Sequence, residues 1–394
     1  MPSGRKIKIL VVFGTRPEAI KMAPLVKELQ KSPNMLPIVA VTAQHREMLD
    51  QVLDLFEIKP HYDLNIMRHG QTLSEITGRV LEGIENIIVK ERPDLVLVHG
   101  DTTTTFASAL AAFYEKTPVG HVEAGLRTRD KYAPFPEEMN RRLTGALADF
   151  HFAPTEAARE NLLKEGVSRD SIFVTGNTVI DALFASVNPE YRFEGLLGRL
   201  DFKNRRIILV TAHRRENWGK PMEEIFSALA ELVDMFSDVE VVFPVHKNPA
   251  IQALAKKLLG GRERVHLIEP LEYAPFVNLM ARCYLVLTDS GGLQEEAPAL
   301  GKPVLVLREI TERPEAVEAG TVRLVGFSRS RIVRETRRLL LDEKEYQAMA
   351  NAVNPYGDGK ASYRIRKWLE YSYGLSSEIP AEFSADFGSR SYKK

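Results

Sequence analysis

Residues 283–307 read "CYLVLTDSGGLQEEAPALGKPVLVL", two short apolar runs separated by a glycine-containing turn and a glutamate-bearing segment. Buried apolar runs that alternate with helical segments are typical of parallel strands covered by helices on both faces. Ser290, Gly291 and Gly292 follow the first run, where a strand passes into a helix. Such a turn lets a ligand approach the backbone closely and offers helix N–H groups to an anion. Glu296, one turn later, suits a neutral diol, so the stretch indicates a nucleotide's diphosphate and ribose.

The same pattern recurs in two series along the chain, which predicts an α/β protein with two doubly wound domains. In open parallel sheets, ligands bind beyond the carboxyl ends of the strands. We therefore expect a short hinge, and an active site in a cleft between domains at 1–177 and 178–361. Residues 377–394 lack periodicity and are expected to form a mobile tail. The expected strands lie at 7–15, 37–43, 94–101, 118–125, 150–155 and 171–177, and then at 206–213, 239–246, 264–270, 284–292, 303–309 and 322–326.

Composition excludes several classes of function. The 394 residues contain 53 Lys and Arg and 53 Asp and Glu, so no net field attracts nucleic acid or an acidic membrane surface. No apolar stretch approaches the roughly 20 residues of a membrane span, and the N-terminus has no signal-peptide pattern. The single Cys283 fits a reducing compartment, and in an apolar run it is expected to be a buried side chain. We expect a cytoplasmic protein.

Charged residues follow several of the expected strands. In "FGTRPEAIKM", Arg16 and Lys21 flank an expected helix N-terminus and are placed to clamp an oxyanion; alternatively, Arg16 is exposed and pairs with Glu18. Asp101 ends the expected strand at 94–101 and is either a proton-transfer group or a helix N-cap. Glu123 has an equivalent position after the following strand. Carboxylates at these strand ends are therefore candidates for acid–base chemistry.

Two later segments add candidates. Glu137 and Glu138 in "PFPEEMNRR" begin an expected helix, where carboxylates serve either catalysis or the helix dipole. His213 in "TAHRREN", beside two arginines, is placed to contact a phosphate or leaving group, or else lies in a solvated basic loop.

The chain has no GxGxxG turn after a strand and no GxxxxGK[ST] motif, so we expect neither NAD nor ATP. His99 with Asp101, and His121 with Glu123, have a spacing that a metal site can use. A catalytic metal usually needs about three protein ligands, and we expect no metal and no other cofactor.

Taken together and in order, "FGTRPEAIKM", "VHGDTTTT", "HVEAGLRT", "PFPEEMNRR", "TAHRREN" and "TDSGGLQEEAP" closely resemble the non-hydrolysing UDP-N-acetylglucosamine 2-epimerases. The resemblance spans about residues 7–372. It implies two Rossmann-like domains in the GT-B-like arrangement of nucleotide-sugar glycosyltransferases, with a C-terminal helix at about 362–376 that packs back on the first domain. It also implies a cofactor-free isomerase and a homodimer.

The resemblance assigns roles residue by residue. The catalytic positions are Asp101, Glu123, Glu137 and His213. The UDP-binding positions are Arg16, Lys21, Phe276, Ser290, Gly291, Gly292, Glu296 and Arg313. An effector site for a second UDP-N-acetylglucosamine is implied at Gln44, Gln71 and His246. Leu271 stands where relatives have glutamine, and Gly70 where some have arginine, which bears on one uracil contact and on the effector site.

The implied reaction inverts C2 of UDP-N-acetylglucosamine to give UDP-N-acetylmannosamine, for cell-surface polysaccharide synthesis. Without a redox cofactor, elimination of UDP to a 2-acetamidoglucal and its re-addition suits the residues, since it needs a base, an acid and cations. A glycosyltransferase would share the diphosphate loop but need an acceptor. A non-catalytic sensor would not need the three carboxylates.

Overall fold

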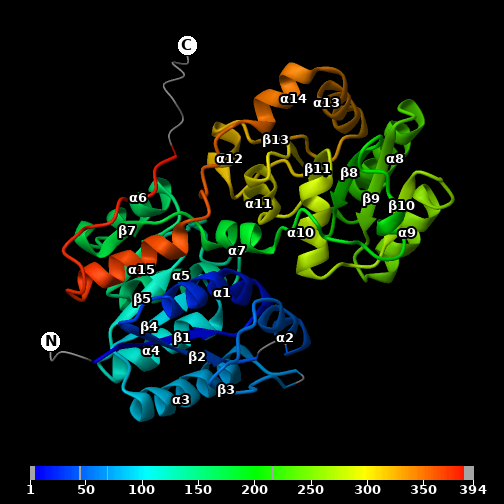
Figure 1. Cartoon of the computed structure of the whole chain (residues 1–394). Helices are drawn as coiled ribbons and strands as arrows, with labels where there is room; N and C mark the ends of the chain where they lie inside the picture. Colours follow the sequence, from blue (N-terminus) through cyan, green and yellow to red (C-terminus); the bar gives the residue numbers. More distant parts are fainter. Residues whose placement is uncertain (1–4, 44–45, 69, 215–216, 386–394) are drawn as a thin grey trace. The chain divides into compact units, whose positions relative to one another are not determined.

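A computed structural model describes residues 5–43, 46–68, 70–214 and 217–385. Its contacts divide the chain into two compact units (Figure 1). Unit 1 contains the described residues up to Ala185 together with Tyr356–Ser384, and unit 2 contains Ser186–Pro355. Each unit is built around one parallel sheet, as the alternating apolar runs predict, so the α/β fold class with two doubly wound units is confirmed.

The sheet of unit 1 has seven parallel strands in the order β3-β2-β1-β4-β5-β6-β7. The strands are β1 Ile7–Phe13, β2 Met35–Val41, β3 Tyr62–Asp63, β4 Leu95–His99, β5 Val119–Val122, β6 Phe150–Ala153 and β7 Ile172–Val174. The helices are α1 Arg16–Gln30, α2 Arg46–Leu55, α3 Leu73–Glu91, α4 Thr103–Tyr114, α5 Glu137–Leu147, α6 Glu156–Lys164, α7 Thr178–Ser186 and α15 Ala361–Ser372. Only β3, a two-residue edge strand, has no counterpart among the expected runs.

The sheet of unit 2 has six parallel strands in the order β10-β9-β8-β11-β12-β13. The strands are β8 Arg206–Thr211, β9 Val239–Pro244, β10 Val265–Ile268, β11 Leu285–Thr288, β12 Val304–Val306 and β13 Val322–Leu324. The helices are α8 Lys220–Met235, α9 Pro249–Leu259, α10 Tyr273–Arg282, α11 Leu293–Ala299, α12 Pro314–Glu318, α13 Arg329–Leu341 and α14 Glu343–Ala350.

The cores explain why these runs become strands. Side chains on both faces of β1, including Leu10, Val11 and Val12, are buried, because helices cover the sheet on both sides. In unit 2, Leu209 of β8 and Val286 of β11 are likewise buried. Cys283 is buried as expected, and burial raises the pKa of its thiol to about 12, so this thiol stays protonated.

The division of the chain differs from the expected boundary near residue 177. Helix α7 belongs to unit 1, because its apolar side chains, including Ile180 and Leu183, are buried there. Asp181 of the same helix accepts hydrogen bonds from the backbone N–H groups of Ala361 and Ser362, at 3.1 and 2.7 Å. The carboxylate therefore ties α7 to the start of α15.

The C-terminal helix returns to unit 1. Helix α15 packs on α1, and its Trp368 lies edge-on against Phe150 and Phe152, with ring centroids 4.8 and 5.4 Å apart. The helix ends at Ser372, a few residues before the expected end, because the chain turns at Gly374, which has a φ of +69°.

The segment that follows α15 is docked as far as it is described. Glu382 accepts hydrogen bonds from the Val174 N–H at 3.0 Å and from Arg159 at 2.7 Å. Phe383 packs beside β7, and its N–H donates to the Val174 carbonyl at 2.8 Å. The expectation of a mobile tail from residue 377 is therefore wrong up to residue 384, because this segment extends the hydrogen bonding of an edge strand.

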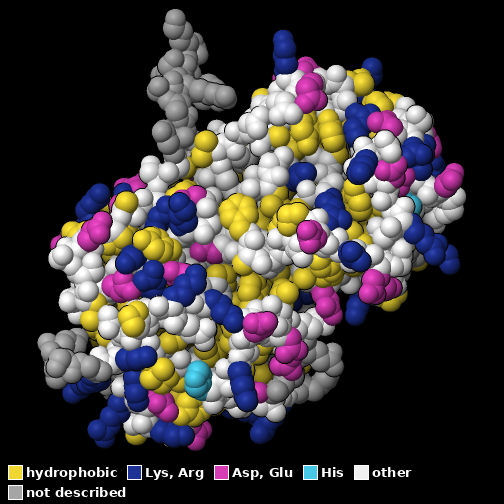
Figure 2. All heavy atoms as spheres, in the orientation of Figure 1, with side chains coloured by type: hydrophobic (Ala, Val, Ile, Leu, Met, Phe, Trp, Pro, Cys, Tyr) yellow, Lys and Arg dark blue, Asp and Glu magenta, His cyan; other side chains and the backbone are white. Residues whose placement is uncertain are grey.

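Lys, Arg, Asp and Glu side chains are interspersed over the face of the molecule drawn in Figure 2, with no large field of one sign. This mixture agrees with the equal numbers of acidic and basic residues. Among the residues described, no helix is long and apolar enough to cross a membrane.

Candidate active site

In each sheet the direction of strand addition reverses once, and the loops that follow the two strands at that point carry several of the candidate residues, among them Asp101, His213 and Ser290. The reversal lies between β1 and β4 in unit 1, and between β8 and β11 in unit 2. Loops that diverge at such a switch point leave room for a ligand beyond the strand ends.

The turn after β1 is held by Glu18. Thr15 is the N-cap of α1 and forms a capping box with Glu18. The N–H groups of Gly14 and Thr15 donate to Glu18 Oε2 at 3.0 and 2.8 Å. These N–H groups are therefore occupied by the protein's own carboxylate. Glu18 is buried and contacts backbone and hydroxyl groups, so the alternative of an exposed Arg16–Glu18 pair is wrong.

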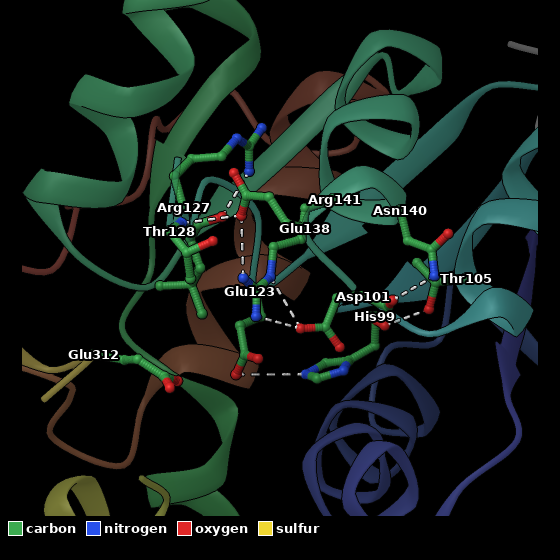
Figure 3. Close-up of polar contacts among 12 residues, drawn as sticks. His99, Asp101, Thr105, Glu123, Arg127, Thr128, Glu138, Asn140, Arg141 and Glu312 are labelled. Carbon is green, nitrogen blue, oxygen red and sulfur yellow. Dashed lines mark hydrogen bonds and ion pairs between the residues drawn. The ribbon is translucent and has the colours of Figure 1, made fainter. Parts of the chain in front are cut away.

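Glu123 follows β5 and is surrounded by hydrogen-bond donors. Lys21 Nζ lies 2.5 Å and Asn177 Nδ2 lies 2.8 Å from Glu123 Oε2. His99 Nε2 is 3.8 Å from the same oxygen (Figure 3). Glu123 also has a φ of +61°, a backbone conformation that non-glycine residues adopt mainly where surroundings or function require it. Lys21, which the resemblance assigns to UDP, is thus a partner of Glu123 in this structure.

Asp101 follows β4 and is held by helix α5. Arg141 donates to Asp101 Oδ2 from Nε at 3.0 Å and from a terminal nitrogen at 2.6 Å. Asn140 donates to the Asp101 carbonyl at 2.9 Å. Thr102, and not Asp101, is the N-cap of α4, so the N-cap alternative for Asp101 is wrong. The Asp101 carboxylate instead forms an ion pair with Arg141.

Glu138 holds Arg141, the partner of Asp101, in place. It is fully buried and accepts hydrogen bonds from the N–H groups of Thr128 and Arg129 at 3.0 and 3.2 Å. Arg141 and Arg142 each donate to it at 3.3 Å, and Figure 3 shows Arg141 reaching both Glu138 and Asp101. Burial raises the pKa of Glu138, but the backbone and arginine contacts lower it by more than burial raises it. The pKa of Glu138 therefore lies below its usual range.

Glu137 begins α5 and has a different environment. Its Oε2 is buried and has no hydrogen-bond partner in the part of the chain that the structure describes. A buried oxygen without a partner is costly, so such an atom suggests that a ligand or water completes the site. Asp101 and Glu123 thus follow two adjacent strands of the unit 1 sheet, and Glu137 begins the helix whose Arg141 pairs with Asp101.

The histidines near these carboxylates are buried and neutral. Burial lowers the pKa of His99 to about 4 and that of His121 to about 3. His121 Nε2 lies 2.7 Å from the Gly100 carbonyl, so this nitrogen carries the proton. Within the described ranges, no group of three His, Cys, Asp or Glu residues is arranged to hold a metal ion.

In unit 2, Asp289 holds the turn that carries His213. Asp289 is fully buried, and its Oδ2 accepts from the N–H groups of His213 and Arg214, both at 2.8 Å. His213 Nδ1 lies 3.2 Å from Asp289 Oδ1, and the His246 ring stacks on the His213 ring with centroids 6.5 Å apart. Burial, Arg214 and His246 lower the pKa of His213, whereas Asp289 opposes them, and the pKa lies below its usual range. Half-exposed and neutral at pH 7, His213 can accept or relay a proton.

The turn at 290–292 is open above its glycines. A Cβ atom on Gly291 would lie 3.9 Å from its nearest neighbour, a nitrogen of Arg214, and one on Gly292 would lie 3.6 Å from Glu296. Gly292 has helical angles of −62° and −40°, which any residue adopts. Neither packing nor backbone conformation therefore requires these glycines, which agrees with the close approach of a ligand.

Helix α11 follows this turn, and its Glu295 and Glu296 contact Arg313 and Tyr273. Tyr273 donates to Glu296 Oε1 at 3.0 Å, and burial, followed by the Glu296 charge, raises the pKa of Tyr273 well above its usual value. Phe276 lies on the same helix as Tyr273 and is half-buried. Arg313 pairs through Nε with Glu295, a buried carboxylate.

The effector candidates are less closely defined. Gln71 accepts a hydrogen bond from the Arg68 N–H at 2.5 Å, and His246 accepts one from the Asn248 N–H at 3.1 Å. Gln44 lies outside the described residues. Gly70 has a φ of +73°, so an arginine at this position would be strained.

Sequence reasoning missed the residues that hold the predicted ones. Arg141, Asp289, Tyr273 and Glu18 touch candidate residues or their turns but were not selected. A Thr-x-x-Glu pattern before an apolar helix marked Glu18, and Asp289 directly follows a strand within "TDSGG". Arg141 and Tyr273 had no such signal.

Comparison with known proteins gives consistent results. The family model described as UDP-N-acetylglucosamine 2-epimerase matches residues 27–370. The UDP-N-acetylglucosamine 2-epimerase of Bacillus subtilis (strain 168) is 57% identical over 380 residues, which cover 96% of this chain and 99% of the relative. A solved structure of S. aureus MnaA with UDP is 52% identical, with a TM-score of 0.87, and covers 96% of this chain and 100% of its own.

A further solved structure, UDP-GlcNAc 2-epimerase from Neisseria meningitidis bound to UDP-GlcNAc, is 52% identical. Its TM-score is 0.81, and the match covers 92% of this chain and 99% of that structure. The family model spans most of the chain, and these relatives align over almost their whole length at more than half identity. This chain therefore belongs to the UDP-N-acetylglucosamine 2-epimerase family.

Proposed function

We propose that this enzyme, an isomerase, interconverts UDP-N-acetylglucosamine and UDP-N-acetylmannosamine by eliminating UDP and adding it back. The proposal is carried by Asp101 and Glu123, which follow adjacent strands of the unit 1 sheet, and by Glu137, which begins the helix that holds Asp101. Relatives named for the same reaction, and a related structure bound to UDP-GlcNAc, support it. The protein is proposed to act in the cytoplasm, where its single buried cysteine stays reduced.

The chemistry explains why several carboxylates are needed. The C2 proton of the sugar is not next to a carbonyl, so its removal alone gives a poorly stabilised carbanion. In the elimination, a base takes the C2 proton, the C1–C2 double bond forms, and the C1–O bond breaks with its electrons passing to UDP. Return of UDP to C1, with proton delivery to the opposite face of C2, gives the epimer. One group must therefore remove a proton and another must supply one.

The three carboxylates are suited to share these steps. Asp101 is oriented by Arg141, and Glu123 is oriented by Lys21 and Asn177. Glu137 has an oxygen that no described protein group occupies. Fixed carboxylates of this kind can act at a defined atom without first reorganising.

Unit 2 is proposed to bind the nucleotide. The open glycine turn at 290–292 accepts the diphosphate, Glu296 accepts the ribose hydroxyls, and Phe276 contacts the base. His213, Arg16 and Arg313 stabilise the leaving diphosphate. Arg313 pairs with Glu295 in this structure and would contact phosphate by exchanging or sharing that partner.

The test is incubation of the protein with UDP-N-acetylglucosamine alone in deuterated water. The manno epimer carrying deuterium at C2 is expected. A glycosyltransferase that has no acceptor, or a sensor, would give no epimer. Retention of the original C2 hydrogen in the product would exclude the elimination mechanism.

Glu137→Gln should lower turnover roughly 10²–10⁴-fold, the range for a positioned acid or base. Glu156→Gln is a matched control, since Glu156 is also the first residue of a helix but is exposed and pairs with Arg159. Equal activity of the two variants would remove Glu137 from the mechanism.

A second UDP-N-acetylglucosamine is proposed as an activator that contacts Gln71 and His246. The stacking of His246 on His213 gives such an effector a direct route to a catalytic candidate. Sigmoidal dependence of rate on substrate, flattened in His246→Ala, is expected; a hyperbolic wild-type curve would refute this role.

The chain is also proposed to form a homodimer. Helices α3, α4 and α5 pack side by side, and large apolar side chains on them are exposed, including Val89, Phe113 and Tyr114 at 55–58%. A second copy of this chain would cover them. Sedimentation should give twice the 44.4 kDa chain mass, and Phe113→Glu should shift the protein toward monomer.

A further inference from the structure

Unit 1 contains two capping boxes of the same type, which differ in what else they touch. Thr15 with Glu18 caps α1, and Thr72 with Glu75 caps α3. In both, the threonine accepts from the glutamate N–H and the glutamate accepts from the threonine N–H. Glu75 is exposed and serves only its own helix end, whereas Glu18 is 3% exposed.

Glu18 divides its two oxygens between two loops. Oε2 accepts from the N–H groups of Gly14 and Thr15 and from the Thr15 hydroxyl, at 2.8–3.0 Å, all in the turn after β1. Oε1 accepts from the Thr102 hydroxyl at 2.6 Å, at the start of α4 after β4, and lies 3.2 Å from the Thr105 hydroxyl, which is 2.5 Å from the His99 carbonyl. One carboxylate thus joins the two loops that diverge at the switch point of the sheet.

A capping role alone does not account for this environment. Burying a carboxylate is costly unless it is hydrogen-bonded, and burial raises the pKa of Glu18 in spite of its hydrogen bonds. Helix capping is achieved at α3 by an exposed glutamate without that cost. The capping box of α3, formed by Thr72 and Glu75, has no contacts that correspond to those of Glu18 with Thr102 and Thr105 among the described residues.

The two joined loops carry proposed functional groups on the neighbouring residues. Arg16 follows Thr15 directly, and Asp101 precedes Thr102 directly. Gly14 is packed closely here, since a Cβ atom on it would lie 2.0 Å from the Thr42 hydroxyl and 2.9 Å from that of Thr104. The turn after β1 thus packs directly against Thr104 of α4, so the two joined loops are neighbours in the fold.

We propose that Glu18 is a positioning residue, which sets the place of Asp101 relative to the Arg16 turn through the hydroxyl of Thr102. The inference rests on the proposed roles of Arg16 and Asp101 in the epimerase reaction. Glu18 itself does not contact substrate; it acts through the two loops. The position of a proton-transfer group matters steeply, since a misplacement of about 1 Å costs about 10²-fold in rate.

The first test compares side chains of different length at position 18. Glu18→Gln keeps the length and can direct its amide oxygen to the Gly14 turn and its NH₂ group to the threonine hydroxyls. Glu18→Asp keeps the charge but is one methylene too short to reach both loops. Glu18→Asp is therefore expected to lose roughly 10²-fold in kcat, and Glu18→Gln clearly less. Equal losses in both variants would overturn the bridging role, because the loss would then not depend on whether the side chain is long enough to reach both loops.

A second test leaves Glu18 in place, in case its replacement prevents folding. Thr102→Val removes the bridging hydroxyl and the N-cap of α4, whereas Thr102→Ser keeps both. Thr102→Val should lower kcat roughly 10-fold or more. Its affinity for UDP should not change, since only the Asp101 turn is released. Thr102→Ser should restore kcat.

Two control variants separate positioning from loss of a helix cap. Glu75→Asp shortens the exposed capping box, and Thr155→Val removes the N-cap of α6, where Thr155 accepts from the Ala158 N–H at 3.2 Å. Both are expected to keep wild-type kcat. A loss in Thr155→Val as large as that in Thr102→Val would overturn the inference.

Amide hydrogen exchange gives a readout that does not need activity. Thr102→Val should speed exchange at the Gly100–Asp101 turn relative to Thr155→Val, and Thr102→Ser should not. Unchanged exchange there would overturn the bridge even if kcat fell. A wild-type protein that makes no manno epimer would refute the proposed function, while the exchange comparison still decides whether Glu18 joins the loops.

Discussion

Asp181→Asn should change how the stability of unit 1 depends on pH. Asp181 lies on α7, is 9% exposed, and accepts two backbone N–H groups at the start of α15. Burial raises the pKa of this carboxyl to about 6 from 3.8, although the N–H groups oppose the shift. The ionised carboxylate is thus less favourable in the folded protein than in the unfolded chain.

The magnitude follows from linkage between proton binding and folding. A shift from 3.8 to about 6 corresponds to a penalty of about 3 kcal/mol that is fully present above pH 6. The penalty declines as the pH falls through 6 and is absent below 3.8. Between pH 8 and pH 5 the wild type should regain about 1 kcal/mol relative to a variant with no titrating group at this position.

The chain contains a suitable probe for the measurement. It has two tryptophans, Trp218 in unit 2 and Trp368 in α15, the helix that Asp181 caps. In a Trp218→Phe background, Trp368 fluorescence reports urea unfolding of unit 1. The unfolding free energy of Asp181→Asn minus that of wild type should decrease by about 1 kcal/mol from pH 8 to pH 5, because only the wild type gains stability.

The offset between the two proteins is not the test, because asparagine also loses one acceptor for the α15 N–H groups. The pH slope is the test. A difference that stays constant over this range, or that grows in favour of the variant as the pH falls, would refute a raised Asp181 pKa.

Three further predictions concern single contacts. Gly292→Ala should raise stability by about 0.4–1 kcal/mol, because Gly292 has helical angles, yet weaken UDP binding; unchanged calorimetric affinity would contradict the glycine turn as a diphosphate site. Tyr273→Phe should leave folding intact and weaken UDP binding roughly 10-fold by removing a hydrogen bond that orients Glu296, and unaltered binding would show that this orientation is unimportant. Glu382→Ala should destabilise unit 1 by about 1 kcal/mol in the Trp368 assay, because it removes partners of Arg159 and the Val174 N–H, whereas no change would indicate that the docked segment contributes nothing.

The strands were predictable because each is a short apolar run buried on both faces. All twelve expected runs contain a strand, and only the two-residue β3 has no apolar run to mark it. The family was also evident from the sequence, since six short motifs occur in order. Domain limits were less accessible: α7 reads as a junction in sequence, and only its buried apolar side chains and Asp181 place it in unit 1.

The candidate site shows the same division. The residues that follow strands, including Asp101, Glu123 and His213, were selected because parallel strands bring their carboxyl ends to one edge. Their partners were not, since Arg141 is 40 residues from Asp101 and Lys21 is 102 residues from Glu123. The family resemblance assigns Lys21 and Arg313 to the nucleotide, whereas in this structure they pair with Glu123 and Glu295.

The amino-acid sequence by itself thus determined the two α/β sheets, the reaction family and the strand ends that carry chemistry, because each of these depends on local pattern or short motif. Tertiary structure alone decided that Glu18 joins two loops, that Glu138 accepts a hydrogen bond from Arg141, and that Asp289 holds the His213 turn. These buried carboxylates are placed by donors from distant segments. Their hydrogen bonds compensate for burial only when the sheet has brought those segments together.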